Sequence, residues 1–140
     1  MSLEASSVII YNSFNQVLLS RRSQSKKIDP GLWETIGGKR EPGETAEECI
    51  IREVSEELGS KVKLLNIKFF RRYEIQYKIG LITYDVFTSE ISGEPEPNKN
   101  EIDCIKWSSQ TEINDLKFCA NVGERLRDFF KIGNALSNTN

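Results

Sequence analysis

The sequence is dominated by one stretch, GGKREPGETAEECIIREVSEELG, which runs from Gly37 to Gly59. Its glycine-rich first part predicts a loop, and its second part predicts a helix that starts after Thr45 and stops at Gly59. Thr45 and Glu48 have the spacing of a capping box, in which each side chain hydrogen-bonds the backbone N–H of the other residue. Gly59 can take the left-handed conformation in which helices often end. One face of this helix is apolar and predicts a packing surface, with Ala46, Ile50, Val54 and Leu58 at every fourth position.

Three glutamates, Glu53, Glu56 and Glu57, share another face of the same helix. Their i, i+3, i+4 spacing places them within about one turn of each other, beside the apolar stripe and therefore at the edge of the core. Like charges this close repel, and the second half of a helix is the negative end of its dipole. A divalent cation would reverse both penalties, and oxygen ligands favour Mg²⁺ or Mn²⁺. A solvated acidic surface is the alternative interpretation of these three residues alone.

The hydrophobic pattern outside this helix predicts several strands and a second helix. Apolar or alternating runs place strands at 8–11, 16–22, 67–79, 81–88 and 102–107, and an amphipathic helix at 121–132. Alternation in the third run puts one set of side chains on its buried side: Ile67, Phe69, Tyr73, Ile75, Tyr77 and Ile79. The closing helix turns four side chains inward: Val122, Leu126, Phe129 and Phe130. Strands interleaved with helices predict an α/β fold with a mixed β-sheet between helices.

The composition narrows the chemistry and the setting of the protein. The chain has 140 residues and no histidine, so a Ser-His-Asp triad and a His-ligated zinc or haem are excluded. With 19 basic and 21 acidic side chains, it has no basic footprint for a nucleic-acid polymer. Its length predicts a single domain over 1–140, frayed at 136–140. Three separated cysteines and the absence of a long apolar run favour a cytoplasmic protein without a membrane segment.

The chain resembles the Nudix hydrolases, and among them the small MutT-like members. The resemblance is carried by the spacing of the family's signature, the Nudix box, at Gly38, Glu44, Arg52, Glu53, Glu56, Glu57 and Gly59. One position departs from it, since Ser60 stands where the family has an aliphatic residue. The likeness extends over roughly 8–130, and it implies the family's α/β/α sandwich with a mixed sheet.

The resemblance implies a metal site and a reaction. In this family a metal-activated water attacks a phosphorus of a diphosphate linkage. Glu56 and Glu57 would hold Mg²⁺ or Mn²⁺, the Gly38 region would add a carbonyl, and Glu53 would bind the metal or accept the proton of the water. Glu101 could add a carboxylate from the loop at 92–100, with an exposed loop glutamate as the alternative.

Two further residues are expected to support catalysis, Arg52 and Glu44. Arg52 would pair with a carboxylate of the box and fix its orientation. Glu44 lies at the junction of loop and helix, where it would help to hold the loop or a metal. Which glutamate acts as the general base is left open between the box residues.

Four residues are candidates for substrate binding. Arg21 and Arg22 end an apolar strand, and one of them would hold a phosphate; Arg22 is favoured because resembling members use the second arginine. A solvated strand end is the alternative. Trp33 could stack on a base, although core packing is the preferred interpretation. Asn121 sits in a stretch that faintly resembles a base-reading segment, although a helix N-cap is preferred.

The resemblance implies a small nucleotide as substrate. The expected reaction cleaves a nucleoside triphosphate, including oxidised ones, to the monophosphate and pyrophosphate. ADP-ribose, nucleotide-sugar and dinucleoside polyphosphate hydrolysis are the alternatives. A non-catalytic nucleotide-sensing module is the alternative of another class, disfavoured because the box glutamates are retained. A prenyl diphosphate isomerase and a messenger-RNA decapping enzyme rank lower, and a homodimer stays open.

Overall fold

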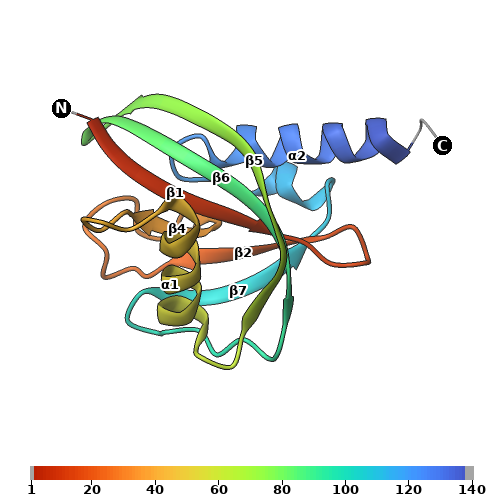
Figure 1. Cartoon of the computed structure of the whole chain (residues 1–140), viewed down its shortest axis with the longest axis horizontal. Coiled ribbons are helices and arrows are strands. Elements are labelled where there is room, and N and C mark those ends of the chain that lie inside the picture. Colours follow the sequence, from red (N-terminus) through yellow and green to blue (C-terminus); the bar gives the residue numbers. More distant parts are fainter. Residues whose placement is uncertain (1, 138–140) are drawn as a thin grey trace.

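A computed structural model describes residues 2–137 of the chain, with side chains over 3–134, so the predicted frayed end at 136–140 falls outside the described side chains. Figure 1 shows the elements. The strands are β1 (Ser2–Ile10), β2 (Val17–Arg22), β3 (Trp33–Glu34), β4 (Ile36–Lys39), β5 (Lys63–Tyr77), β6 (Gly80–Ser92) and β7 (Ile102–Ser108). The helices are α1 (Ala46–Leu58), the short 3-10 helix η1 (Glu112–Asp115) and α2 (Val122–Ser137).

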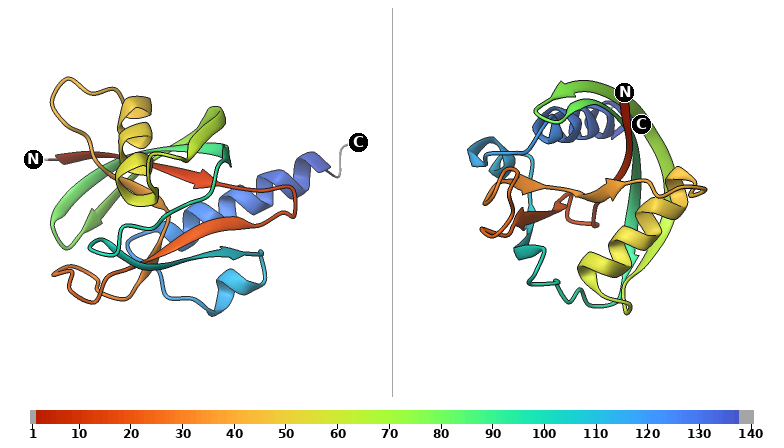
Figure 2. Two further views of the ribbon diagram at one scale, coloured as in Figure 1. Left: turned by 90° about the horizontal axis from the view of Figure 1, so that it is seen from below. Right: turned by 90° about the vertical axis from the view of Figure 1, so that its left-hand side faces the viewer.

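The strands form two sheets. The larger has the order β4-β1-β6-β5, with β1 and β6 parallel and the outer pairs antiparallel, while β3, β2 and β7 form the smaller antiparallel sheet. Strands β1 and β2 meet at the bridge between Tyr11 and Val17 and then diverge into different sheets. The predicted mixed α/β fold is confirmed, with the strands divided between two sheets. Figure 2 (right) shows α1 and α2 on opposite sides of the strands.

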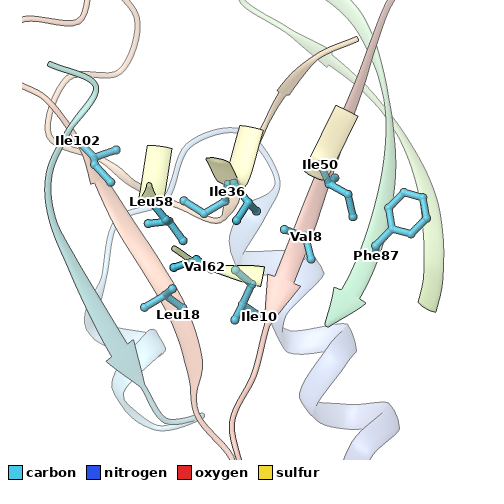
Figure 3. Close-up of a cluster of buried hydrophobic side chains, with 10 residues drawn as sticks. Val8, Ile10, Leu18, Ile36, Ile50, Leu58, Val62, Phe87 and Ile102 are labelled. Carbon is cyan, nitrogen blue, oxygen red and sulfur yellow. The ribbon is translucent and has the colours of Figure 1, made fainter. Parts of the chain in front are cut away.

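Strand β1 is buried on both faces. Successive side chains of a strand point to opposite sides, so Val8 and Ile10 pack in the cluster that contains Ile50 of α1, shown in Figure 3. Ile9, between them, packs in the second cluster with Leu126 of α2. Each helix therefore covers its own hydrophobic core, and the apolar run of β1 belongs to both.

Helix α1 has the ends that its sequence predicts. The Thr45 hydroxyl accepts the N–H of Glu48 at 3.1 Å, and the Glu48 carboxylate accepts the N–H of Thr45 at 2.9 Å. Gly59 follows the last helical residue with a φ of 94°, a conformation that favours glycine. Local chemistry therefore sets both ends of the helix that carries the box glutamates.

The alternation predicted at 67–79 is wrong in part. Strand β5 changes register against β6 between Leu65 and Lys68 and again between Phe69 and Arg71. Each extra residue reverses which face the following side chains occupy. Phe69 is therefore exposed, and Phe70 instead packs against the cluster beside α2. Ile79, also predicted inward, lies in the turn before β6 and is exposed.

Two further elements differ from the sequence prediction. The glycine-rich segment expected as a loop forms β4, which pairs with β1 from Ile36 to Lys39. Helix α2 runs beyond the predicted end, and it buries Val122, Leu126 and Phe130 as expected. Over residues 2–137, neither helix combines the length and the apolar character that a membrane crossing requires.

Candidate active site

A polar cavity of about 430 Å³ lies between α1, β4 and the loop before β7. It gathers the predicted metal ligands from distant parts of the chain. Its lining consists of Arg22, Lys26, Glu34, Gly37, Gly38, Glu53, Glu56, Glu57, Asn98 and Glu101. We refer to it as the acidic cavity, because carboxylates dominate its walls.

Two glycines let β4 fit between β1 and α1. A Cβ added to Gly37 would lie 2.3 Å from the backbone oxygen of Ser6, and one added to Gly38 would lie 2.4 Å from Oε1 of Glu53. A side chain at Gly37 would therefore collide with the backbone of β1, and one at Gly38 would displace the Glu53 carboxylate. The Gly38 carbonyl accepts the thiol of Cys49 at 3.5 Å, so this carbonyl faces α1 at the edge of the acidic cavity.

Arg52 joins the carboxylates of the box. Its Nε and Nη2 donate to the two oxygens of Glu44 at 2.7 and 3.0 Å, and its Nη1 donates to Glu53 at 3.0 Å and to Glu56 at 3.2 Å. The predicted pairing of Arg52 with a box carboxylate is thus present. This hydrogen-bonded guanidinium lowers the pKa of Glu44 to about 2. One arginine offsets the repulsion that the glutamate spacing creates.

Glu57 is the most buried of the helix glutamates. Its exposed fraction is 9%, and its Oε2 atom is buried without a hydrogen-bond partner among the described residues. Burial and the nearby Glu53 carboxylate raise the pKa of Glu57 well above its ordinary value. Burial also raises the pKa of Glu53. A buried carboxylate without a partner is costly, and a bound cation would relieve that cost.

The donors around the acidic cavity fit a divalent metal in kind. They are carboxylate and carbonyl oxygens, the ligands that Mg²⁺ and Mn²⁺ prefer. Over residues 2–137, no three His, Cys, Asp or Glu side chains are yet gathered into a ligand set, since Glu53 and Glu56 turn to Arg52. The orphaned Glu57 oxygen is a buried acceptor on a residue that lines the acidic cavity, and a bound cation would supply the partner that it lacks among the described residues.

Glu101 reaches the acidic cavity from the opposite side. Its carboxylate pairs with Lys26, and the side chain remains 45% exposed. The backbone N–H of Asn98 donates to the Glu57 carbonyl at 2.9 Å, which ties the loop before β7 to α1. The structure therefore brings the loop glutamate beside the box, as a ligand role would need.

A second cavity of about 190 Å³ adjoins the first. Most of its surface is apolar, and its lining comes mainly from β1, β4, β6 and the segment that leads into α2. Four residues line both cavities: Arg22, Glu34, Gly37 and Gly38. We refer to the second space as the apolar cavity. The two cavities therefore lie side by side, with charged walls around one and mostly apolar walls around the other.

The two arginines that end β2 face different ways. Arg22 lines both cavities and its Nη1 donates to Glu34 at 3.0 Å. Arg21 points to the other side, where it lies 3.6 Å from Asp103 and stacks on the ring of Trp33 at 5.8 Å. Of the two predicted phosphate ligands, the structure places Arg22 in the site and Arg21 outside the lining of both cavities.

Trp33 and Asn121 do not line either cavity. Trp33 packs against the core beside α2, which agrees with the preferred interpretation of its role. The side-chain oxygen of Asn121 accepts the Nε–H of Arg125 at 3.0 Å, and among the described residues it accepts no N–H from the first turn of α2. Asn121 instead orients an arginine that does reach the apolar cavity.

Sequence reasoning missed Arg125 and Glu34. Arg125 lines the apolar cavity with an exposed fraction of 3%, and Glu34 lies beside Arg22 where burial raises its pKa. One signal for Arg125 was present, because it sits three residues after Val122 within the inward face of the closing helix. Glu34 lies outside the strands and helices that the sequence predicts, and no chemical role was expected of it.

The comparisons with known proteins agree on one family. The NUDIX domain model matches residues 1–129. The NAD-capped RNA hydrolase NudC of Pseudomonas aeruginosa is 28% identical over 128 residues, or 91% of this chain and 44% of that protein. The chain thus spans less than half the length of this relative. The 8-oxo-dGTP diphosphatase of Haemophilus influenzae is 32% identical over 94 residues, 66% of this chain and 67% of that protein.

Other relatives and solved structures widen the comparison. An isopentenyl-diphosphate Delta-isomerase of Saccharopolyspora erythraea is 33% identical over 109 residues, 74% of this chain and 56% of that protein. The solution structure of the E. coli ORF135 protein aligns with a TM-score of 0.78 at 21% identity, covering 96% and 92% of the two chains. A MutT protein structure from Methanosarcina mazei Go1 gives 0.76 at 23% identity, covering 97% and 95%. The fold is shared, the family model spans most of the chain, and the chain belongs to the NUDIX domain family.

Proposed function

We propose that this protein is a divalent-metal-dependent hydrolase that cleaves a diphosphate linkage in a nucleotide, in the simplest case a nucleoside triphosphate. One observation carries the proposal: a carboxylate-lined cavity lies beside an apolar cavity, and Arg22, Gly37 and Gly38 line both. A nucleotide has the same two-part character, with a charged phosphate chain at one end and a flat, mostly apolar base at the other.

The acidic cavity would hold the metal and the reacting phosphates. Glu56 and Glu57 are the proposed ligands, together with the Gly38 carbonyl and Glu101. Bound there, a divalent cation neutralises phosphate charge and lowers the pKa of a water molecule. Glu53, whose pKa burial already raises, is suited to accept a proton from that water.

Two arginines have different proposed roles at this end of the site. Arg22 can exchange its contact with Glu34 for a substrate phosphate, because it lines both cavities. Arg52 would hold the carboxylates of Glu44 and Glu53 in position. The glycines of β4 let the phosphate chain approach the backbone closely.

The substrate follows from the apolar end of the site. The apolar cavity has a volume of about 190 Å³, which suits one base. It has no room for a second large group such as another nucleoside. A nucleoside triphosphate, plain or oxidised, giving the monophosphate and pyrophosphate, is therefore favoured over ADP-ribose, nucleotide sugars and dinucleoside polyphosphates. The relatives bear names of three different activities, so this chain's own cavity must decide.

Hydrolysis of a nucleotide panel tests the proposal. The panel holds normal and 8-oxo nucleoside triphosphates, ADP-ribose, diadenosine polyphosphates and nucleotide sugars, each with Mg²⁺ or with a chelator. Glu57→Gln removes the orphaned carboxylate and should abolish turnover. Glu47→Gln, an exposed glutamate of the same helix outside the cavity, is the matched control and should leave it unchanged.

The outcomes separate an enzyme from a binding module. Turnover that needs both the metal and Glu57 supports the hydrolase, and the preferred compound identifies the substrate. A folded protein that binds nucleotide but cleaves nothing in the panel would support the nucleotide-sensing alternative and contradict the proposal.

A further inference from the structure

Arg125 is a buried arginine without a carboxylate partner. Its exposed fraction is 3%, its Nη1 donates to Ser7 Oγ at 2.7 Å, and its Nε donates to Asn121 Oδ1 at 3.0 Å. Arg22 and Arg52 each have a carboxylate within 4 Å, whereas Arg125 has none in the part of the chain that the structure describes. A buried charge is costly unless it is paired, so this arrangement points to a missing partner.

The guanidinium of Arg125 is held in one orientation. Its carbon lies 4.3 Å from the centre of the Tyr84 ring, a distance that allows a strong cation–π contact. A guanidinium carries five N–H donors, and the two hydrogen bonds to protein side chains use two of them. The remaining donors are fixed in place and ready for an acceptor.

These donors belong to the apolar end of the site. Arg125, Ser7 and Tyr84 line the apolar cavity, and none of them lines the acidic cavity. The Ser7 oxygen already accepts from Arg125, so its hydroxyl proton is also available to donate. A ligand in this cavity therefore meets hydrogen-bond donors against otherwise largely apolar walls.

We propose that Arg125 determines which base the protein accepts, by favouring 6-oxopurines over adenine. The inference rests on the proposed function, in which the base occupies the apolar cavity. A guanidinium forms a two-pronged contact with O6 and N7 of guanine, both of which are acceptors. Adenine presents an amino donor at the corresponding position, and a donor facing Arg125 would remain unpaired.

The test compares GTP with ATP. Values of kcat/KM are measured with Mg²⁺ for the unchanged protein and for Arg125→Gln, with the melting temperature of each. The unchanged protein should prefer GTP by roughly 5- to 150-fold, the discrimination that one good two-pronged contact provides. Arg125→Gln should lose most of this preference through a higher KM for GTP, because a base contact acts in ground and transition states alike.

Two further variants separate specificity from folding. Arg127→Gln changes an exposed arginine of the same helix outside the apolar cavity and should keep the preference for GTP. Arg125→Lys keeps the charge without the two-pronged geometry and should keep only part of it. If Arg125→Gln does not fold, Ser7→Ala removes the hydroxyl that orients the guanidinium, and a lower GTP-to-ATP ratio is then the supporting result.

The results that overturn this inference differ from those that overturn the proposed function. Equal use of GTP and ATP by the unchanged protein, or an unchanged ratio in both Arg125→Gln and Ser7→Ala, rejects the role of Arg125 while hydrolysis stands. No turnover of either nucleotide, together with none across the rest of the panel, rejects the hydrolase. Calorimetric binding of GTP and ATP then decides the role of Arg125, because a preference that Arg125→Gln abolishes would still support it.

Discussion

Arg52 and Arg125 have opposite electrostatic surroundings. Arg52 contacts carboxylates that line the acidic cavity, whereas Arg125 itself lines the apolar cavity. Arg52 donates to the carboxylates of Glu44, Glu53 and Glu56 within 3.2 Å. Arg125 is more deeply buried and donates to two neutral oxygens. The protein itself neutralises the first arginine, whereas it leaves donors of the second unused.

The difference shows how one site can be divided by charge. The surroundings of Arg52 carry an excess of negative charge, which suits a metal and, through it, a phosphate chain. The surroundings of Arg125 lack a carboxylate within ion-pair distance among the described residues, which suits a neutral acceptor. An arginine enclosed by acids orients them, and one enclosed by apolar walls is free to select a ligand.

The largest expected effect is on kcat, and it comes from substituting Glu53 in the acidic cavity. Glu53→Gln keeps the shape of the side chain and removes its ability to accept a proton. We expect kcat to fall by about 10²–10⁴-fold, the usual contribution of a general base. Steady-state kinetics on the preferred nucleotide measure it, with Glu47→Gln as the control. A fall of less than about tenfold would remove Glu53 from proton transfer.

The next effect concerns how Arg52 orders the acids. Arg52→Gln should lower kcat by about 10–100-fold, as loss of an orienting contact does. It should also move the acidic limb of the pH profile to higher pH, because the arginine lowers the pKa of Glu53 and Glu44. Arg71→Gln breaks an ion pair between β5 and α2, away from both cavities, and serves as the control. A lower kcat with an unshifted limb would contradict the orienting role.

The third effect concerns stability, to which the ionised side chains of two box glutamates, Glu44 and Glu57, contribute with opposite sign. Arg52 lowers the pKa of Glu44 to about 2, so its stabilising contribution is present above the unfolded pKa and is lost as the pH falls from about 4.3 toward 2. The pKa of Glu57 is raised, so its burial becomes more costly as the pH rises above the unfolded value. Between pH 5 and pH 8 with a chelator present, Glu57→Gln should therefore melt higher than the unchanged protein.

Melting curves from pH 2 to pH 8 check both signs at once. Glu44→Gln should melt lower than the unchanged protein at neutral pH and should lose its disadvantage near pH 2. If Glu57→Gln melts lower at neutral pH without metal, then the buried carboxylate is stabilised by contacts within the protein. The proposed opening for a cation would be wrong in that case.

The sequence predicted the parts of the fold that local chemistry decides. The ends of α1 follow from Thr45, Glu48 and Gly59, each of which acts on its own neighbours. The prediction that Phe69 points inward was wrong, because the register of β5 is set by its pairing with β6. A bulge depends on the partner strand, so alternation within one strand does not reveal it.

The candidate site divides in the same way. Residues on one helix face, such as Glu53 and Glu57, were predicted together because helical spacing is local. The resemblance favoured Arg22 over Arg21 as the phosphate ligand, and in the fold Arg22 lines the acidic cavity whereas Arg21 does not. Arg125 was missed because its partners, Ser7 and Tyr84, are more than 40 positions away. Contacts between such distant segments exist only after folding.

The smallest expected effect concerns the edge of the apolar cavity. Asp29, in the loop between β2 and β3, is 8% exposed and accepts hydrogen bonds from Tyr77 and Lys78. These contacts fix the turn that carries Ile79 into the lining of the apolar cavity. Asp29→Asn removes the charge, and asparagine tolerates the positive φ of 51° at this position.

We expect Asp29→Asn to raise the KM for the preferred nucleotide by roughly two- to fivefold at unchanged kcat, because an ion pair with an exposed partner contributes about 0.2–1 kcal/mol. Lys61→Gln breaks the exposed pair with Glu96 and should change neither constant. A change in kcat would place Asp29 in the chemical step. An unchanged KM would show that the apolar cavity keeps its shape without this contact, and Arg125 would then act on the base independently of the turn.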